Sequence, residues 1–564
     1  MPTPRLPVVL LWHMHQPQYR DVLTGRYVLP WTYLHAIKDY TDMAAHLESQ
    51  SGARAVVNFT PVLLEQLDEL AQRVAQHLAS GSPLPDPVLS LLGPDPLPQS
   101  GAERLELLRA CLRAQRKHMI ERFGPYLELA TLAETLASVD RVVYASDQMI
   151  FDLAVWYHIA WLGETVRRVD PRVAALTEQG RGFTAAQRRE LLSLIGELLA
   201  QVIPRFRRLG ESGQCELSVS PYSHPIVPLL IDFQAARESA PASPLPKHAR
   251  YPGGSERAGY QVAESIRVFT QYFGARPQGC WPSEGAISRP TLELLDRFGF
   301  RWAASSANVL RASLGSGLSG ADDANAYNRP YRLPGSSLNC FFRDDRLSDL
   351  IGFTYATWHG DDAVQNLVHE LVQLASSYAG GQHGVLIALD GENAWEHYPF
   401  NGYYFLRALY AALADHPALE LTTLSDCVTR GVAPVPLQRV VAGSWVHGTL
   451  GTWMGDAAKN AAWDLLCEAK LAFDEVLVRG TLAGERLIAV ERQLALCESS
   501  DWFWWFGDYN PPEAVSQFDQ LFRRQLTSLY GLLERAAPES LSQPISVGRG
   551  TMEHGGVMRR AFAT

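Results

Sequence analysis

The sequence places ionisable side chains in or directly after several short apolar runs. Such runs predict buried strands, and in parallel α/β folds the active site lies at the carboxyl ends of the strands. We therefore expect one rim to collect six residues: His13, His15, Glu216, His224, Glu284 and Asp390. A pair of carboxyl groups among histidines and aromatic rings suits glycosidic bond cleavage, because one can attack while the other protonates the leaving oxygen.

Other chemistries find less support in the sequence. No serine stands in a nucleophile-elbow context, and neither a glycine-rich phosphate loop nor a cysteine–histidine pair is apparent. The spacing of His13 and His15 also occurs among metal ligands. A metal-dependent carbohydrate hydrolase or deacetylase, with these histidines and Asp390 as ligands, is therefore an alternative. A non-catalytic glucan-binding protein is another, although the paired carboxyl groups of Glu284 and Asp390 argue against it.

The elements that would position these side chains alternate between apolar runs and helical patterns. Continuous apolar strands between helices indicate a parallel sheet covered on both faces, hence an α/β barrel or a doubly wound sheet. Two helices are predicted at 290–300 and 363–381, each ending at glycine. The predicted strands are VVLLW (8–12), AVVNF (55–59), ELSVS (216–220), QGCW (278–281), RWAASS (301–306), NCFF (339–342), VLIAL (385–389) and ELTTL (420–424).

Two changes in composition divide the chain. A proline-rich stretch at 80–101 leads into a long helical region, and helical patterns replace strands after about residue 440. The final residues show no pattern of a packed element. We therefore predict four parts: a catalytic barrel at 1–440, a mainly helical insertion within it at about 80–210, a C-terminal helical domain at 441–536, and a flexible tail at 537–564.

Composition excludes several classes of partner. The chain has 564 residues, 47% of them hydrophobic, and a formal charge of −10, so nucleic acid and anionic membranes are not expected to bind it. No run is long enough to span a membrane, and the N-terminus lacks the features of a signal peptide. Seven widely spaced cysteines suggest neither a zinc cluster nor a disulfide framework. We expect a cytoplasmic protein, and the sequence does not give its oligomeric state.

Five motifs carry a resemblance to a known family. They resemble, in order, the five sequence regions of glycoside hydrolase family 57, and the segments 341–355 and 500–508 are similar to stretches of its amylopullulanase-like and α-amylase-like branch. The resemblance covers nearly the whole chain. The motifs are HMHQP (13–17), ELSVSPYSHP (216–225), WPSE (281–284), DGENAW (390–395) and SWVHGTLGTWMGDAAKNAAWD (444–464).

The resemblance implies a fold and an activity. The family has an incomplete (β/α)7 barrel followed by a helical region that completes the cleft, so one of the eight predicted strands, ELTTL, is expected outside the barrel. Its members act on α-glucans with retention, as α-amylases, amylopullulanases, 4-α-glucanotransferases or branching enzymes. We expect hydrolysis of α-1,4 linkages, with the preference between α-1,4 and α-1,6 linkages left open, and 4-α-glucanotransferase or branching activity is the alternative. No cofactor or metal is implied.

The resemblance also implies site residues. Glu284 matches the nucleophile and Asp390 the general acid/base, whose carboxyl groups in a retaining enzyme stand about 5–5.5 Å apart. His13 and His224 match substrate-contacting histidines, with His15 and Glu216 in support. The region before Glu216 reads GQCE (213–216) instead of the family's Gly-Asn pair.

Several neighbouring residues complete the expected site. Glu392 is close enough to Asp390 in sequence to raise its pKa by like-charge repulsion, whereas Glu396 is interpreted as a solvated bystander. The run WFWW at 502–505 is interpreted as core packing. Two or three of five tryptophans are expected to stack on sugar rings: Trp281, Trp358, Trp395, Trp445 and Trp453.

Overall fold

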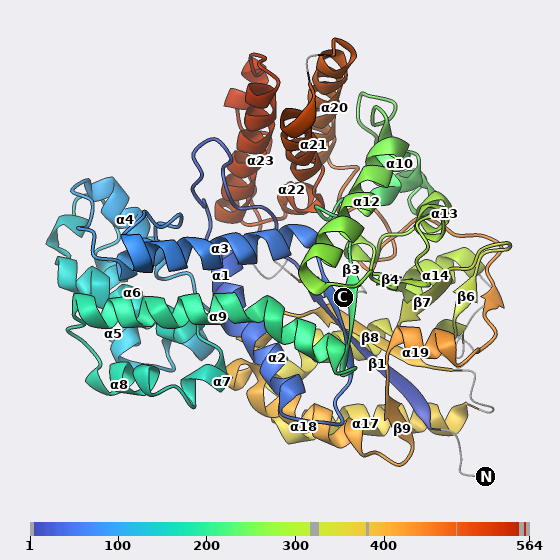
Figure 1. Ribbon diagram of the computed structural model, residues 1–564, viewed down its shortest axis with the longest axis horizontal. Coiled ribbons are helices and arrows are strands. Elements are labelled where there is room, and N and C mark those ends of the chain that lie inside the picture. Colours follow the sequence, from blue (N-terminus) through green and yellow to red (C-terminus); the bar gives the residue numbers. More distant parts are fainter. Residues whose placement is uncertain (1–4, 316–325, 379–382, 481, 552–557, 560–564) are drawn as a thin grey trace.

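The structure is a computed structural model, and Figure 1 shows its elements in sequence colours. A parallel barrel lies at its centre, with helices around it and a group of helices, α20 to α23, standing over one end. The described residues are 5–315, 326–378, 383–480, 482–551 and 558–559.

Seven parallel strands close into the barrel in the order β1-β2-β3-β4-β5-β7-β8, and β8 pairs again with β1. The fold class expected from the sequence, an incomplete (β/α)7 barrel with helical additions, is confirmed. The strands are β1 (Leu6–Met14), β2 (Ala55–Phe59), β3 (Cys215–Val219), β4 (Gly279–Cys280), β5 (Trp302–Ser306), β7 (Asn339–Arg343) and β8 (Val385–Asp390).

Three further strands extend the sheet outside the closed ring. β6 (Tyr331–Arg332) runs antiparallel to β7, and β10 (Val435–Pro436) pairs with β6. β9 (Leu419–Leu421) pairs with β1 and lies off the barrel path. The expectation that the segment ELTTL falls outside the barrel is thus confirmed, although its last residue already begins the helix α19 (Leu424–Thr429).

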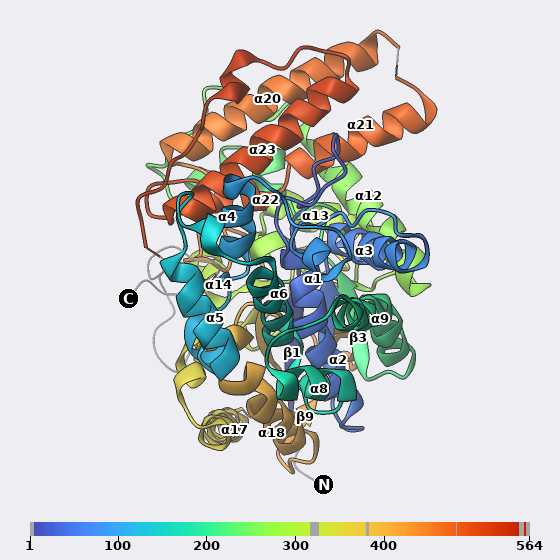
Figure 2. The ribbon, with the colours of Figure 1, turned by 90° about the vertical axis from the view of Figure 1, so that its left-hand side faces the viewer.

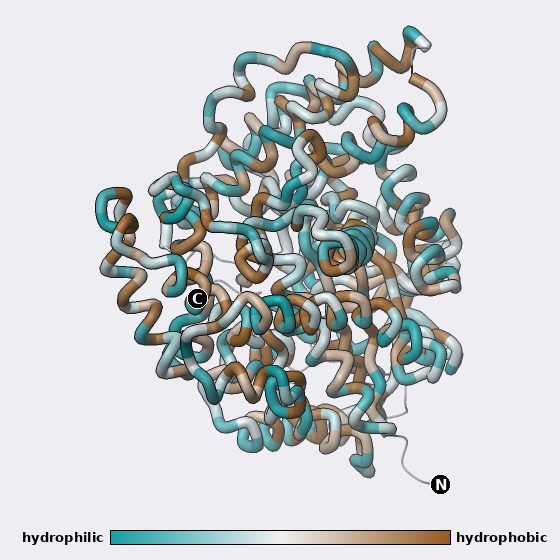
Figure 3. The backbone as a smooth tube through the Cα atoms, turned by 60° about the vertical axis from the view of Figure 1, so that its left-hand side comes forward, coloured by the Kyte–Doolittle hydropathy of each residue, from teal (hydrophilic) through white to brown (hydrophobic). Residues whose placement is uncertain are grey.

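Local sequence explains how these elements form. In β1 every residue except Pro7 is buried, as expected for a strand covered on both faces. The helix α3 (Pro61–Ser80) starts with proline at its first position, where the missing N–H costs nothing, and it ends at Gly81 with a φ of 73°. Figure 3 shows hydrophobic and hydrophilic residues alternating along the helices, which is the pattern of helices with one packed face.

The helical insertion follows β2. Its helix α9 runs from the outer part of the insertion to the barrel beside β3, and α4, α5, α6 and α8 lie farther out (Figure 1), where Figure 2 shows them from that side. The bounds are α4 (Gly101–Ala110), α5 (Gly124–Thr135), α6 (Asp147–Trp161), α7 (Glu164–Arg167), α8 (Pro171–Gln179) and α9 (Ala185–Glu211).

Helices also follow the other barrel strands and surround the sheet. Their bounds are α1 (Trp31–His35), α2 (Thr41–Glu48), α10 (Val227–Ile231), α11 (Ala235–Ser239), α12 (Gly254–Phe273), α13 (Arg289–Arg297), α14 (Ala307–Leu314), α16 (Asp345–Asp349), α17 (Gly360–Ser377) and α18 (Tyr403–Ala414). The predicted helix at 290–300 matches α13, and its end at Gly299 has a φ of 77°. The glycine end predicted at 380–381 lies outside the described residues.

The C-terminal region is helical and covers the end of the barrel where β1 and β8 finish. It consists of α20 (Ala457–Val478), α21 (Gly484–Cys497), α22 (Ser500–Trp505) and α23 (Pro512–Leu532). After α23 the described chain packs back on this helix, since Ile545 donates its backbone N–H to Asp519 at 2.7 Å and Leu541 is buried. The predicted flexible tail lies partly outside the described residues, at 552–557 and 560–564. Among the described helices, none is long and apolar enough to cross a membrane.

Candidate active site

A cavity of about 470 Å³ opens at the carboxyl ends of the barrel strands. The helical insertion borders it through Trp161 and 113–115, and the C-terminal helices cover it through Trp504, Trp505 and Phe518. Seven of the twelve residues proposed from the sequence line this cavity: His13, His15, His224, Glu284, Asp390, Glu392 and Trp445.

Asp390 is fixed at the end of β8 by its neighbours on β1. The parallel register sets Asp390 opposite His13, and the next residue, Gly391, donates its N–H to the His13 carbonyl at 2.7 Å. A Cβ atom at Gly391 would stand 2.2 Å from the sulfur of Met14, so a larger residue at this position would displace the buried Met14 side chain. Asn393 donates a hydrogen bond to the Asp390 carboxylate at 2.9 Å.

Glu284 sits in a strained turn after β4. Its φ is 59°, and His224 across the cavity has a φ of 64°, which is the left-handed region that non-glycine residues rarely adopt. Such conformations cost about 1–3 kcal/mol each and cluster at functional sites. Trp445 holds Glu284 twice, because its backbone N–H donates to the Glu284 carbonyl at 3.0 Å and its indole Nε1 donates to Oε2 at 2.8 Å.

The two carboxyl groups interact electrostatically. Desolvation, followed by the negative charge of Asp390, raises the pKa of Glu284 to about 8. Desolvation also raises the pKa of Asp390. Coupled groups of this kind release their protons in two steps that belong to the pair. Two coupled carboxyl groups with raised pKa values can retain a proton at higher pH than isolated carboxyl groups, which acid–base chemistry requires.

Three histidine rings stack beside these carboxyl groups. His13 Nδ1 lies 2.7 Å from Asn58 Oδ1, and His13 Nε2 lies 3.0 Å from His224 Nε2. Desolvation and the neighbouring His15 lower the pKa of His13 to about 3, and the same two causes lower that of His224. His13 and His224 are therefore neutral and present hydrogen-bonding edges to the cavity without charge.

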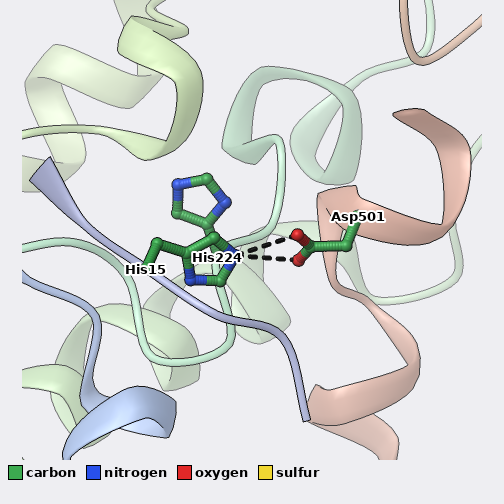
Figure 4. A group of neighbouring side chains, drawn as sticks. All are labelled: His15, His224 and Asp501. Atoms are coloured by element: carbon green, nitrogen blue, oxygen red, sulfur yellow. Dashed lines mark hydrogen bonds and ion pairs between the residues drawn. The ribbon is translucent and has the colours of Figure 1, made fainter. Parts of the chain in front are cut away.

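His15 joins β1 to the C-terminal helices. Its Nε2 lies 2.9 Å from the Asp501 carboxylate at the start of α22, and its Nδ1 lies 2.9 Å from the hydroxyl of Thr60 (Figure 4). His224 is also held by α22, because its Nδ1 lies 2.9 Å from the hydroxyl of Ser500 at the start of that helix. Both histidines are thus positioned by α22.

The side chains of His15, His224 and Asp501 lie close enough to be considered as metal ligands, since one ligand atom from each lies within 4.8 Å of the others. The ring arrangement opposes this use. The two imidazoles are stacked with centroids 3.9 Å apart and planes 24° apart (Figure 4). In-plane nitrogen lone pairs on stacked rings do not converge on one ion at the short distances that coordination requires.

Glu392 is buried and held by hydrogen bonds from two other segments. Its Oε1 accepts hydrogen bonds from the His15 backbone N–H at 3.0 Å and from the Tyr40 hydroxyl at 3.2 Å. Desolvation and then the charge of Asp390 raise the pKa of Glu392 well above its usual value. Glu392 therefore keeps its proton to higher pH than an ordinary carboxyl group, and a protonated Glu392 adds no negative charge beside Asp390. Glu396 lines the outer part of the cavity.

Glu216 does not reach the cavity, which corrects its expected position at the rim. It is the second residue of β3, near the amino end of the strand, whereas the cavity lies at the carboxyl end. Its carboxylate accepts hydrogen bonds from the Trp302 indole at 2.6 Å and from the Ser425 backbone N–H at 2.9 Å. Glu216 therefore joins β3, β5 and α19 below the site.

Four of the five candidate tryptophans also lie outside the cavity lining. Trp281 packs its ring against that of Trp445, at 5.1 Å between centroids. Trp395 donates its indole N–H to the Gly391 carbonyl at 2.8 Å, which supports the turn after Asp390. Trp453 is fully buried, and Trp358 is 42% exposed on the surface.

Sequence reasoning did not single out several residues that line the cavity. Arg343 ends β7, and its guanidinium carbon lies 4.7 Å from the centre of the Trp445 ring. Asp501, Trp504 and Trp505 belong to the segment SDWFWWFGD. All four residues of its run WFWW are buried, as the interpretation as core requires, and Trp504 and Trp505 also line the cavity.

The closed parallel barrel carries a coupled carboxyl pair and neutral histidines at the carboxyl ends of its strands. This arrangement is typical of barrel enzymes that use acid–base chemistry. Residues 9–437 match the model of Glycosyl hydrolase family 57. The chain belongs to this family.

Solved structures share the fold. A family 57 branching enzyme from Thermococcus kodakaraensis superposes with a TM-score of 0.57 at 16% identity, over 93% of this chain and 90% of that one. A branching enzyme from Pyrococcus horikoshii gives 0.56 at 16% identity, over 97% and 99%. An α-amylase from Thermotoga maritima gives 0.56 at 14% identity, over 96% of each chain. At these identities the similarity concerns the fold alone.

Proposed function

We propose that this protein is a retaining glycosidase that acts on α-glucans, with Glu284 as nucleophile and Asp390 as general acid/base. The observation that carries the proposal is the coupled carboxyl pair, which comes from the ends of two different strands into one cavity with neutral histidines. Glu284 attacks the anomeric carbon while Asp390 protonates the leaving oxygen. Asp390 then takes a proton from the acceptor that releases the glycosyl-enzyme.

The surrounding side chains support this division of roles. The hydrogen bond from Trp445 to Glu284 favours an ionised carboxylate, as a nucleophile requires. The mechanism needs the shared proton on Asp390 when the glucan is bound. His13 and His224, both neutral, suit hydrogen bonds to the hydroxyl groups of an uncharged sugar. We propose hydrolysis of α-1,4 linkages as the main activity.

Transfer to a second glucan is the other candidate, and the lining under the C-terminal helices favours it. Trp504, Trp505, Phe518 and Met558 give this part of the cavity an aromatic and apolar surface. Such a surface excludes water and offers rings on which an acceptor sugar can stack. A glycosyl-enzyme in this cavity would then meet sugar hydroxyls in preference to water, which gives 4-α-glucanotransferase or branching activity.

One product profile tests both candidates. The protein is incubated with amylose, pullulan and single maltooligosaccharides, and Glu284→Gln serves as the blank. We expect amylose and maltooligosaccharides to be shortened by the wild type only. Formation of longer oligosaccharides from short ones would show that the main activity is transfer and not hydrolysis. Unchanged glucans in every incubation would refute the proposed function.

A further inference from the structure

Two described residues of the C-terminal segment lie at the candidate active-site cavity. Met558 and Arg559 both line it, although sequence patterns gave no sign that residues so near the C-terminus contribute to the site. The guanidinium carbon of Arg559 lies 4.3 Å from the centre of the Trp504 ring and 4.7 Å from that of Tyr509. These distances are typical of cation–π contacts. The two rings therefore hold Arg559 at the wall of the cavity.

The rings that hold Arg559 are themselves fixed. The Tyr509 hydroxyl accepts a hydrogen bond at 2.6 Å from the ammonium group of the buried Lys459. Lys459 also donates to the Phe503 carbonyl at 2.8 Å, next to Trp504. The guanidinium adds only long hydrogen bonds, from Nη1 to the Tyr509 hydroxyl at 3.5 Å and from Nη2 to Asn510 Oδ1 at 3.4 Å. Stacking, with little hydrogen bonding, thus places Arg559.

One donor of Arg559 is buried without a partner. The Nε of Arg559 makes no hydrogen bond within the described part of the chain, although it is shielded from solvent. An unsatisfied buried donor is costly, about 1–3 kcal/mol and more for a charged group, so its presence in a cavity wall indicates a missing ligand. A guanidinium offers several N–H groups in a planar fork, which suits the adjacent hydroxyl groups of a sugar.

The positive charge of Arg559 also affects the pKa of a group in the carboxyl pair. Its positive charge lowers the pKa of Glu284, against the negative charges of Asp390 at the end of β8 and Asp501 on α22, which both raise it. The imidazole of His224 lies 4.0 Å from the Glu284 carboxylate and is neutral. The guanidinium therefore acts electrostatically on the proposed nucleophile from the wall of the same cavity.

We propose that Arg559 is a substrate-binding residue that donates hydrogen bonds to the hydroxyl groups of an α-glucan next to Trp504, beneath the C-terminal helices. It selects glucans long enough to reach this wall. The inference rests on the proposed function for its substrate class, and it assigns a specificity role to the last described residue of the chain.

Three variants distinguish the effects of the guanidinium hydrogen bonds, of the positive charge and of the C-terminal segment as a whole. Arg559→Ala removes fork and charge, Arg559→Lys keeps the charge, and Arg549→Ala is the control, because Arg549 is exposed on the same C-terminal segment. Values of kcat and KM are measured for maltooligosaccharides of increasing length, together with the pH dependence of kcat/KM and the melting temperature. The melting temperature serves to detect a merely structural effect.

We expect Arg559→Ala and Arg559→Lys to raise KM for long maltooligosaccharides by about 10-fold or more, the usual effect of losing a hydrogen bond to a charged group. For the shortest substrates KM should change little. Arg559→Ala should also shift the acid limb of kcat/KM to higher pH, since loss of the cation raises the pKa of Glu284, and Arg559→Lys should leave that limb in place. Arg549→Ala should resemble the wild type.

Several results would overturn the inference: unchanged KM in Arg559→Ala, equal losses for short and long substrates with a lowered melting temperature, or the same losses in Arg549→Ala. Calorimetric binding of maltoheptaose to Glu284→Gln separates this inference from the proposed function. If maltoheptaose binds, Arg559→Ala weakens that binding and the wild type shows no turnover, the proposed function is refuted and the assignment of Arg559 as a binding residue stands. Absence of binding in every variant would refute both.

Discussion

The indole nitrogen of Trp445 donates a hydrogen bond at 2.8 Å to the carboxylate of Glu284, a residue 161 positions earlier in the chain. The same tryptophan donates its backbone N–H to the Glu284 carbonyl and packs under the guanidinium of Arg343. Trp445 therefore fixes both the backbone and the charged group of the proposed nucleophile. It belongs to the chain segment that leads from the barrel to the C-terminal helices.

Replacing Trp445 by phenylalanine removes this donor and keeps an aromatic ring. Because a hydrogen bond to a charged group contributes about 1.5–3 kcal/mol, we expect kcat/KM to fall by about 10- to 100-fold. The acid limb of the pH profile should move to higher pH, because the hydrogen bond lowers the pKa of Glu284. Trp358→Phe, on the surface, is the matched control. An unchanged pH profile in Trp445→Phe would contradict the role of this contact.

The coupled carboxyl pair predicts a bell-shaped pH profile of kcat/KM. Activity needs one proton on the pair, so the rate falls at low pH, where both groups are protonated, and above about pH 8, where the last proton is lost. Asp390→Asn leaves only Glu284 to titrate. With an aryl α-maltoside, whose leaving group needs no protonation, the acid limb of Asp390→Asn should stay near that of the wild type, in which Asp390 is still protonated and uncharged at that pH, and the alkaline limb should disappear. An alkaline limb that persists near pH 8 in Asp390→Asn would show that this limb does not belong to the pair.

The stacked histidines predict that activity does not depend on a metal ion. Dialysis against a chelator should leave kcat/KM for maltooligosaccharides unchanged, because His15 and His224 would have to rotate out of their stack to share an ion. Loss of activity on chelation, with recovery on adding Zn²⁺ alone, would instead favour the metal-dependent alternative.

Glu216 should affect stability and not catalysis. Glu216→Gln places amide N–H groups where the Trp302 and Ser425 donors now point, so about 1–3 kcal/mol of stability is lost and the melting temperature falls. Values of kcat and KM measured well below that temperature should match those of the wild type. A reduced kcat in Glu216→Gln with an unchanged melting temperature would indicate that Glu216 contributes to catalysis.

Much of the fold was predictable because its signals are local. The strands β1 and β8 contain continuous apolar runs, and such runs identify a strand covered on both faces without any knowledge of its neighbours. The polar C-terminal flanks of the predicted strands then identified Glu284, Asp390 and the three histidines as residues of one rim. The exact domain boundaries stay predictions.

The remaining features depend on contacts that a sequence does not display. His15 contacts Asp501, which lies 486 positions later in the chain, and the sequence around either residue does not indicate this contact. Glu216 stands in a motif with His224, yet its place near the amino end of β3 turns it away from the cavity. The left-handed conformation of Glu284 has no signal in residue type, and that of His224 has only a weak one, because histidine adopts this region more often than most residues but still rarely.

The most direct test of the account is the identity of the residue that becomes glycosylated. A fluorinated α-maltosyl fluoride, whose fluorine slows release of the intermediate, is incubated with the wild type and with Glu284→Gln, and the labelled peptide is identified by mass spectrometry. The account predicts one maltosyl group on Glu284 in the wild type and none in Glu284→Gln. A label on Asp390, or turnover with inversion of the anomeric configuration, would contradict it.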